Sequence, residues 1–212
     1  TVSVTTTDDD VAGFTITETG GSTSVDESGT TDTFTVVLDA QPNSDVVFAI
    51  SSSDTGEATV TSTLTFTSAN WDTAQTVTVT GVDDDLIDGA QTSSLTIAVI
   101  DAISDDNFDS VADQTVSVTT TDDDVAGFTI TETGGSTSVA ESGTTDTFTV
   151  VLDAQPSSDV VLSISSADTG EATVTSTLTF TSANWDTAQT VTVTGADDDL
   201  VDGTQTSSFT IA

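Results

Sequence analysis

The chain has 212 residues, 36 of them Asp or Glu, and it contains no Lys, Arg, His or Cys. With a formal net charge of −36 and no side-chain cation, it has nothing to neutralise a phosphate, which excludes nucleic acid and anionic membrane surfaces as partners. The same composition excludes disulfides and side-chain amide crosslinks that need an amine. A hydrophobic fraction of 34% in patterned runs still predicts a folded chain.

The predicted elements are short strands, because apolar residues alternate with Thr or Ser. In chain order, the runs of the first half are Phe14 to Ile16, Phe34 to Leu38, Asp45 to Ile50, Leu64 to Phe66, Val77 to Val79, Leu95 to Ile97 and Val116 to Val118. Turn signals such as Gly20-Gly21 and Asp88-Gly89 separate them. No run has helical spacing, and none approaches the roughly 18 apolar residues of a membrane span, so we expect no membrane insertion.

The sequence also repeats itself, since TVSVTTTDDDVAGFTITETGG begins at Thr1 and again at Thr115 and the two copies differ at nine positions. This period exceeds the roughly 20 to 50 residues of solenoid units, so each copy is expected to be a domain. We expect residues 1–10 to be the last strand and acidic exit segment of a preceding repeat, 11–124 to be a complete β-sandwich, and 125–212 to be a second sandwich that lacks its last strand. The chain is thus expected to be an excerpt of a longer tandem array.

Seven strands per repeat predict an all-β fold class, with tandem seven-stranded, immunoglobulin-like antiparallel sandwiches. The two copies support the prediction of which strand positions point into the core. Phe48 becomes Leu162, so the inward position stays apolar, while its outward neighbour Ala49 becomes Ser163. The second sandwich is expected to have an open sheet edge. Residues 1–7 of a neighbouring molecule are a candidate strand for that edge, and a simple cut in the excerpt is the alternative.

Acidic residues gather in runs that follow strand ends. The runs are Asp8 to Asp10, Asp83 to Asp85 with Asp88, Asp122 to Asp124, and Asp197 to Asp199 with Asp202. Several carboxylates without His or Cys favour a hard cation, and Ca²⁺ tolerates irregular loops better than Mg²⁺. The alternative is that these runs merely solvate loops. For the separate segment from Asp105 to Asp109, a solvated hairpin is preferred to an ion site.

The stretches DDDVAGFTIT, SVDES and GVDDDLIDG resemble Calx-beta domains, known from the calcium-sensing region of sodium/calcium exchangers. The phrases FTSANWDTAQTVTVTGVDDD and TVSVTTTDDD are similar to Calx-beta-like tandem repeats of giant bacterial surface adhesins. The resemblance covers essentially the whole chain. It implies a seven-stranded immunoglobulin-like sandwich whose calcium ligands gather at one end.

Carried over by position, the resemblance implies a calcium ligand set in each repeat. The implied ligands are Glu27, Asp83, Asp84, Asp85, Asp88, Asp122, Asp123 and Asp124, then Glu141, Asp197, Asp198, Asp199 and Asp202, with Asp8, Asp9 and Asp10 serving a preceding domain. One further ligand is either Asp54 or Glu57 in the first repeat and either Asp168 or Glu171 in the second. Exchanger domains continue with further acids where this chain has residues 89–91, Gly-Ala-Gln, so fewer ions per site are expected. The second site lacks a closing triplet and is expected to be weaker.

These features predict a calcium-stabilised extracellular stalk repeat of a large surface adhesin or fibre, of the kind found in biofilm and cell adhesion. Its expected partners are adjacent repeats of the same chain, and also other copies if strands are exchanged. Calcium is the only expected cofactor. Two alternatives remain: a self-assembling filament subunit, and a carbohydrate- or receptor-binding module in which Trp71 and Trp185 stack on ligands rather than cap the core.

An enzyme is not expected. The tripeptide of aspartic proteases occurs twice, at 54–56 and 168–170, but in ordinary turns without the apolar flanks of those enzymes. Without His, Cys or Lys, no Ser has its usual base.

Overall fold

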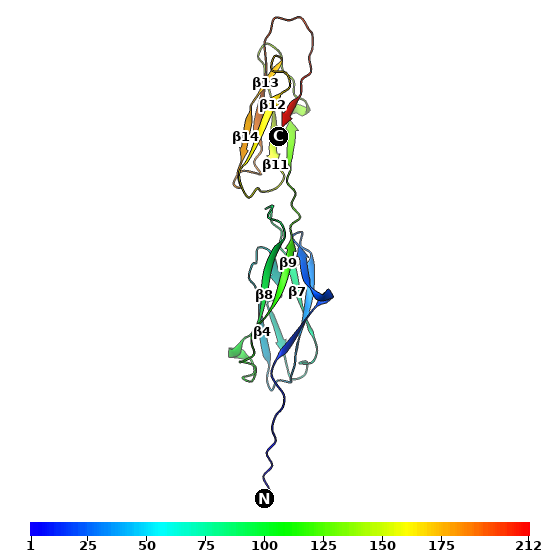
Figure 1. Ribbon diagram of the computed structural model, residues 1–212, viewed down its shortest axis with the longest axis vertical. Helices are drawn as coiled ribbons and strands as arrows, with labels where there is room; N and C mark the ends of the chain where they lie inside the picture. Colours follow the sequence, from blue (N-terminus) through cyan, green and yellow to red (C-terminus); the bar gives the residue numbers. More distant parts are fainter. The chain divides into compact units, whose positions relative to one another are not determined.

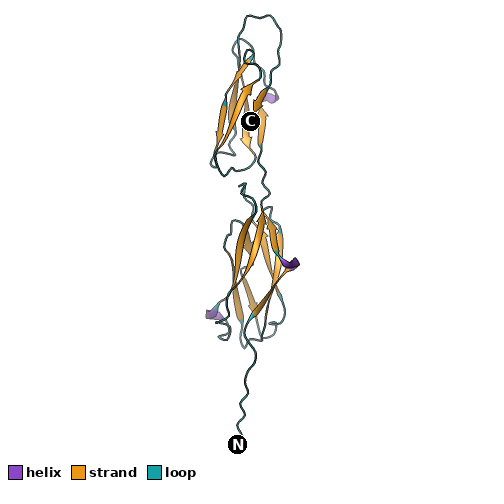
Figure 2. Cartoon of the chain, viewed as in Figure 1, coloured by secondary structure: helices purple, strands orange, loops and turns teal.

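The computed structural model describes all 212 residues, and its regular elements are β-strands apart from three short 3₁₀ segments (Figure 2). This confirms the all-β class. The chain forms two compact units, residues 1–84 with 89–123 and residues 85–88 with 124–212. No helix is long and apolar enough to cross a membrane.

The first unit is a sandwich of two sheets, in which β8, β9 and β4 mark one sheet and β7 the other (Figure 1). Its strands are β1 (Phe14–Glu18), β2 (Thr23–Asp26), β3 (Thr31–Leu38), β4 (Val46–Ser52), β5 (Ala58–Val60), β6 (Thr63–Phe66), β7 (Gln75–Gly81), β8 (Gln91–Val99) and β9 (Gln114–Thr121). The sheet orders are β1-β3-β7-β5 and β2-β9-β8-β4-β6. All seven predicted runs are strands, and the immunoglobulin-like class is confirmed. The short strands β2 and β5 are additional.

The strand β2 exists because the chain changes sheets after β1. Gly20 and Gly21 have φ angles of 76° and 88°, a left-handed backbone that glycine adopts without a steric penalty. This turn ends β1 in one sheet and starts β2 in the other, where β2 pairs with β9 in parallel, Thr23 opposite Val118. The expected purely antiparallel pairing is therefore wrong for this one pair.

The core of the first unit is built on phenylalanines that point inward from facing strands. Phe34, Phe48 and Phe66 are fully buried, and the rings of Phe14 and Phe48 meet edge to face with centroids 4.8 Å apart, a favoured geometry. Trp71 is partly buried and packs against this core. Trp185 does the same in the second unit, as expected if both Trp residues cap the core.

The second unit repeats most of this plan. Its strands are β10 (Phe128–Glu132), β11 (Thr145–Leu152), β12 (Val160–Ser166), β13 (Ala172–Val174), β14 (Thr177–Phe180), β15 (Gln189–Gly195) and β16 (Phe209–Ile211). They form the sheets β10-β11-β15-β13 and β14-β12-β16. No strand here corresponds to β2 or β9, so the second sheet is narrower than its counterpart in the first unit.

The loop between β8 and β9 is held by a buried carboxylate rather than being a solvated hairpin. Asp105 is 4% exposed and accepts hydrogen bonds from the backbone N–H groups of Asn43 at 2.6 Å, Ser44 at 2.9 Å and Asn107 at 3.0 Å. The N–H of Asn107, followed by that of Ser44, lowers the pKa of the Asp105 carboxyl below its ordinary 3.8. Asp105 is therefore a structural clamp.

We expect Asp105→Asn to destabilise the first unit by about 1–3 kcal/mol at pH 7, because a charged acceptor of several N–H groups is replaced by an amide. Since the folded pKa lies below 3.8, this contribution is present above that pH and is lost as pH falls through the folded value. Denaturant unfolding of both proteins at pH 7 and at about pH 2.5 measures it. The exposed neighbour Asp106 supplies the control, Asp106→Asn. If the free energies of unfolding of Asp105→Asn and the parent chain differ by the same amount at both pH values, the role of Asp105 as a clamp is contradicted.

Candidate metal centre

The first part of the site is Glu27, which follows β2. Its backbone N–H donates to the carbonyl of Thr121 at 3.1 Å, directly beyond the β2–β9 pairing. Its side chain is only 1% exposed. The backbone of Asp26, the residue before Glu27, lies close to the end of β7. This close contact requires a glycine at position 81, since a Cβ on Gly81 would lie 2.1 Å from the backbone oxygen of Asp26. Strand pairing and one close backbone contact therefore fix the position of Glu27.

The second part is Glu57, which immediately precedes β5. Its carbonyl accepts hydrogen bonds from the Val82 N–H at 2.9 Å and from the Thr120 hydroxyl at 3.4 Å. Its side chain is 8% exposed, and a carboxylate oxygen of Glu57 lies within 4.8 Å of one from Glu27. Two buried acids from distant parts of the sequence thus face each other.

The third part is Asp122, the residue after β9. One of its carboxylate oxygens lies within 4.8 Å of one from Glu27, and its Oδ2 accepts the N–H of Gly89 at 2.7 Å. Gly89 has a φ angle of 72°, which favours glycine and turns this N–H toward Asp122. The segments that end β2, β9 and the acidic loop before β8 therefore converge.

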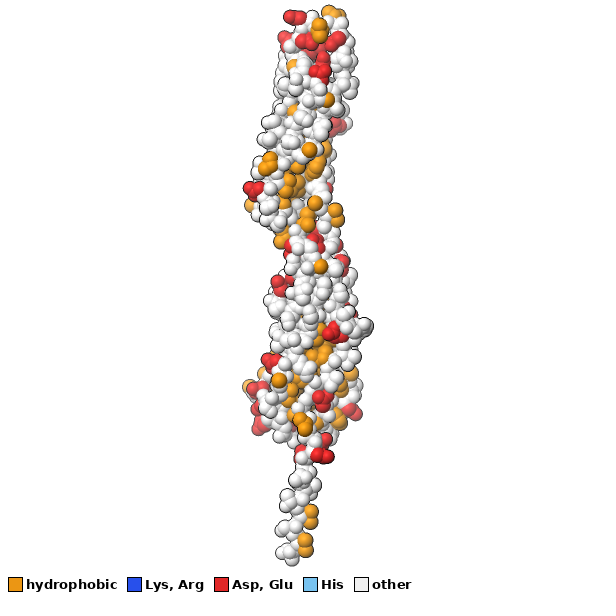
Figure 3. Space-filling model, viewed as in Figure 1, with side chains coloured by type: hydrophobic (Ala, Val, Ile, Leu, Met, Phe, Trp, Pro, Cys, Tyr) orange, Lys and Arg blue, Asp and Glu red, His pale blue; other side chains and the backbone are white.

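Electrostatics make this convergence costly without a cation. Burial and nearby like charges both disfavour ionised carboxylates, and the chain has no Lys, Arg or His to pair with them. In the space-filling view no blue side chain accompanies the red ones (Figure 3). Clustered oxygen donors of this kind suit a hard divalent ion, and calcium accepts six to eight such ligands in irregular geometry. The donor set fits calcium.

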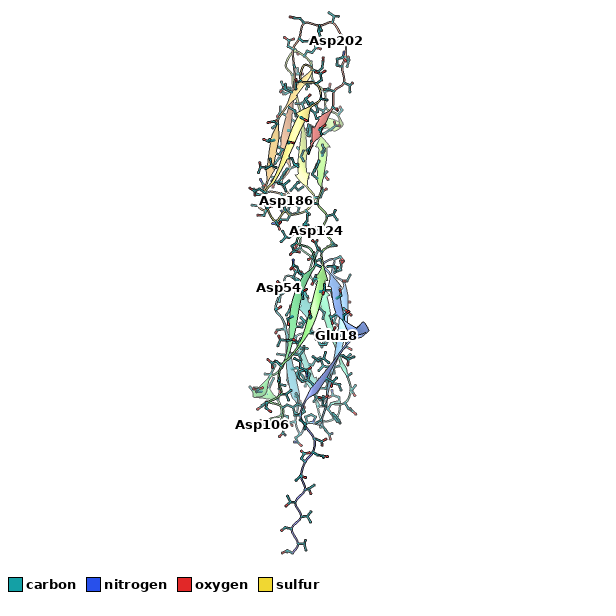
Figure 4. The ribbon with its side chains drawn as sticks, in the orientation of Figure 1. Glu18, Asp54, Asp106, Asp124, Asp186 and Asp202 are labelled. Atoms are coloured by element: carbon teal, nitrogen blue, oxygen red, sulfur yellow. The ribbon has the colours of Figure 1, made fainter.

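The second unit assembles a related group from Glu171, Asp198 and Asp202, whose oxygens lie within 4.8 Å of one another. One period earlier in the sequence these are Glu57, Asp84 and Asp88. Partial burial, followed by repulsion from Asp202 and Asp198, raises the pKa of the Glu171 carboxyl. Asp202 lies on the long loop before β16, at the tip of this unit (Figure 4).

The structure places the paired alternatives for the further ligand differently. Asp54 lies in a turn, where its Oδ1 accepts the N–H of Gly56 at 3.0 Å. Asp168 accepts the N–H of Gly170 at the same distance. It is Glu57 whose carboxylate is brought to Glu27, and Glu171 whose carboxylate joins the second group. The two Asp-Thr-Gly tripeptides are thus turns closed by their own aspartates, one in each unit.

The other predicted ligands differ in burial. Asp122, Asp124, Asp198 and Glu141 are half-buried, whereas Asp83, Asp84, Asp85, Asp88, Asp123, Asp197, Asp199 and Asp202 are exposed. Asp8, Asp9 and Asp10 form an exposed group in the extended segment before β1. Sequence reasoning did not find the roles of Gly81 and Gly89, although their place at strand and loop ends was a signal.

Comparison with known proteins gives structural likenesses only, because no family model and no curated protein matches the chain. The calcium binding domain CBD12 of CALX1.1 is 15% identical with a TM-score of 0.34, covering 87% of this chain and 76% of that one. The E. coli chaperone DraB is 8% identical with a TM-score of 0.40, covering 86% and 87%. Domains 4–9 of the surface layer protein SbsC are 18% identical with a TM-score of 0.34, covering 93% and 28%. These TM-scores are low, and the fold assignment rests on the strand pairing above.

We expect Gly81→Ala to weaken metal binding at Glu27 and to destabilise the first unit by about 1–3 kcal/mol, because the new methyl group overlaps the Asp26 backbone. Calorimetric calcium titration and thermal unfolding measure both effects. Gly13→Ala is the matched control, since its Cβ would meet only the side-chain carboxylate of Asp39, which can move. An unchanged calcium affinity in Gly81→Ala would show that this close approach does not position the site.

Proposed function

We propose that the chain is a calcium-stabilised structural repeat that works as an extender of an extracellular surface adhesin or fibre. One observation carries the proposal: Glu27 and Glu57, 1% and 8% exposed, hold carboxylate oxygens within 4.8 Å of each other in a chain without a side-chain cation. A divalent ion would neutralise them and allow both to stay buried and ionised. The sandwich itself would provide length.

The proposed ligands of the first repeat are Glu27, Glu57 and Asp122, with Asp84 completing the shell because it is the counterpart of Asp198 one period earlier. In the second repeat Glu171, Asp198 and Asp202 would bind an ion with fewer protein ligands. Glu57 and Glu171 take the place that sequence analysis left open between them and Asp54 and Asp168.

The expected affinity suits a compartment rich in calcium. Extracellular calcium modules bind at roughly 10⁻⁴ to 10⁻³ M, so about 10 mM calcium adds on the order of 1.4–2.7 kcal/mol of stability per site. That gain is a substantial share of the margin that keeps a domain folded. The absence of Lys and Arg also leaves no site for trypsin-like proteases, which suits a protein exposed outside a cell.

The acidic triplet Asp122–Asp124 also gives the proposal a mechanical aspect. β9 ends at Thr121 and β10 begins at Phe128, so the triplet is half of the connecting segment. An ion bound by Asp122 would fix the direction in which the chain leaves β9 and shorten the free linker. Calcium would thereby stiffen an array of such repeats.

We expect calcium to raise the melting temperature by about 5–10 °C, from the stabilisation above and the usual enthalpy of domains of this size. Differential scanning calorimetry with calcium, with magnesium, and with chelator measures it, and magnesium should stabilise less because it demands a strict octahedron. X-ray scattering should show a stiffer linker with calcium. A melting curve and a scattering profile that chelator leaves unchanged would refute the proposal.

Glu27→Gln gives a sharper test because its effect should change sign with calcium. In chelator it removes one of two adjacent buried charges, so the variant should be as stable as the parent chain or more so. In about 10 mM calcium it loses a ligand, and its calcium-induced gain should fall by about 1 kcal/mol or more. Asp106→Asn removes the same charge from an exposed position. Asp106 lies far from Asp54, which marks the turn just before Glu57 (Figure 4), so this variant should show neither effect. A variant destabilised equally in both conditions would indicate a purely structural glutamate.

A further inference from the structure

Asp26 lies directly before Glu27, and its carboxylate joins two separate parts of the first unit. Its Oδ1 accepts hydrogen bonds from the N–H of Ser28 at 3.1 Å and from the Ser28 hydroxyl. Its Oδ2 accepts a hydrogen bond from the hydroxyl of Thr121 at 2.9 Å. One oxygen therefore holds the turn after β2, and the other holds the end of β9.

The two residues of this second contact each lie one position before a proposed metal ligand. Asp26 and Thr121 are opposite each other in the parallel β2–β9 pair, and Glu27 and Asp122 follow them in the chain. The Glu27 N–H donates to the Thr121 carbonyl at 3.1 Å, and carboxylate oxygens of Glu27 and Asp122 lie within 4.8 Å of each other. The bond between Asp26 and Thr121 therefore fixes the separation of the two strand ends that carry these acids.

A side-chain contact matters at this position because the backbone alone holds β2 weakly. The strand has four residues, lies at the edge of its sheet and pairs only with β9. Edge segments with few hydrogen bonds open at a low cost in free energy. Before an ion binds, the buried charges of Glu27 and Glu57 repel each other, which favours an outward movement of β2. Asp26 opposes that movement.

The internal repeat sets Asp26 apart from the proposed ligands. Among the nine positions at which the two copies differ, it is the one that changes charge, since Ala140 takes its place. The turn itself is kept, because the Ala140 N–H donates to the Thr144 hydroxyl at 2.6 Å, as the Asp26 N–H donates to the Thr30 hydroxyl at 2.7 Å. The ligand glutamate is also kept, as Glu141. The copies therefore share the ligand and differ in the contact that holds it.

We propose that Asp26 is a positioning residue for the metal site of the first unit. It binds no ion itself but holds β2 against β9, so that Glu27 is in place when calcium arrives. The inference rests on the calcium site proposed above and adds a means of tuning it. A repeat with Asp at this position would bind calcium more tightly than a repeat with Ala that has the same ligand glutamate. An array of both kinds would fill its sites over a range of calcium concentrations.

Three substitutions separate the hydrogen bonds of Asp26 from its charge. Asp26→Ala removes both and should weaken calcium binding about tenfold, the lower end of what outer-shell partners contribute. Asp26→Asn removes only the charge, because its carbonyl can accept from Ser28 and its amide can donate to the Thr121 hydroxyl. It should weaken binding by less than about threefold. Thr121→Val removes the hydroxyl without a change in charge and should lose nearly as much affinity as Asp26→Ala.

Calcium titration followed by NMR reads the two sites separately in the full chain. The amide of Gly89, which donates to Asp122, reports the first site, and its counterpart Gly203 in the second unit is the internal control. The affinity measured at Gly203 should be the same in the parent chain and the three variants. If Asp26→Ala and Asp26→Asn weaken the response at Gly89 equally, or if Thr121→Val leaves it unchanged, the positioning role is refuted.

A failure of the calcium site itself gives a different result. A parent chain in which neither glycine signal responds to calcium would refute the proposed function. A double-mutant cycle of Asp26→Ala and Thr121→Val in chelator then measures the contact without the ion. The two losses of stability should be non-additive, because both variants remove the same hydrogen bond. Additive losses would show that the two side chains do not act together and would overturn the proposal.

Discussion

The structure depends on one constraint: every ionised side chain carries the same sign. In most proteins an acidic cluster is balanced in part by Lys or Arg, but here 36 carboxylates have no such partner. The fold responds by placing most acids in exposed loops, where water screens them. Glu27 and Glu57 break this pattern, since pairing of β2 with β9 and the start of β5 bring them together under cover. No side-chain cation can neutralise their charge, so a cation from solution would favour the ionised form of both.

The strand β9 connects this electrostatic constraint to the packing of the sandwich. It fills the core with Val116 and Val118, bonds to β8 and β2, and ends in the acidic triplet. Its pairing with β2 also locates Glu27, through the N–H that donates to Thr121. In the second unit, where no strand takes this place, Glu141 is only half-buried and the core stands open. Site and core are thus completed by the same element.

The sequence predicted the strands well because alternation records which face is buried. All seven runs became strands, and Phe48 and Leu162 at one repeat position are both buried. It did not predict β2, β5 or the parallel pair, because a short strand after a glycine turn has little periodicity of its own. The sequence also could not predict the different surroundings of Asp54 and Glu57. Both are acids beside one turn, and only the fold shows that Asp54 closes that turn while Glu57 is buried.

The repeat places an apolar strand and an acidic triplet in one continuous segment, and this arrangement couples packing to charge. Whatever strand of this sequence enters the sandwich, its final residues arrive at the end where Glu57 or Glu171 lies, because strand register fixes where the triplet emerges. Apolar burial would drive the strand in, while the carboxylates delivered with it would repel those already present. A bound cation would remove that repulsion and add to strand insertion. Folding of each repeat would then strengthen with calcium, because the same segment brings both the apolar residues and the acids.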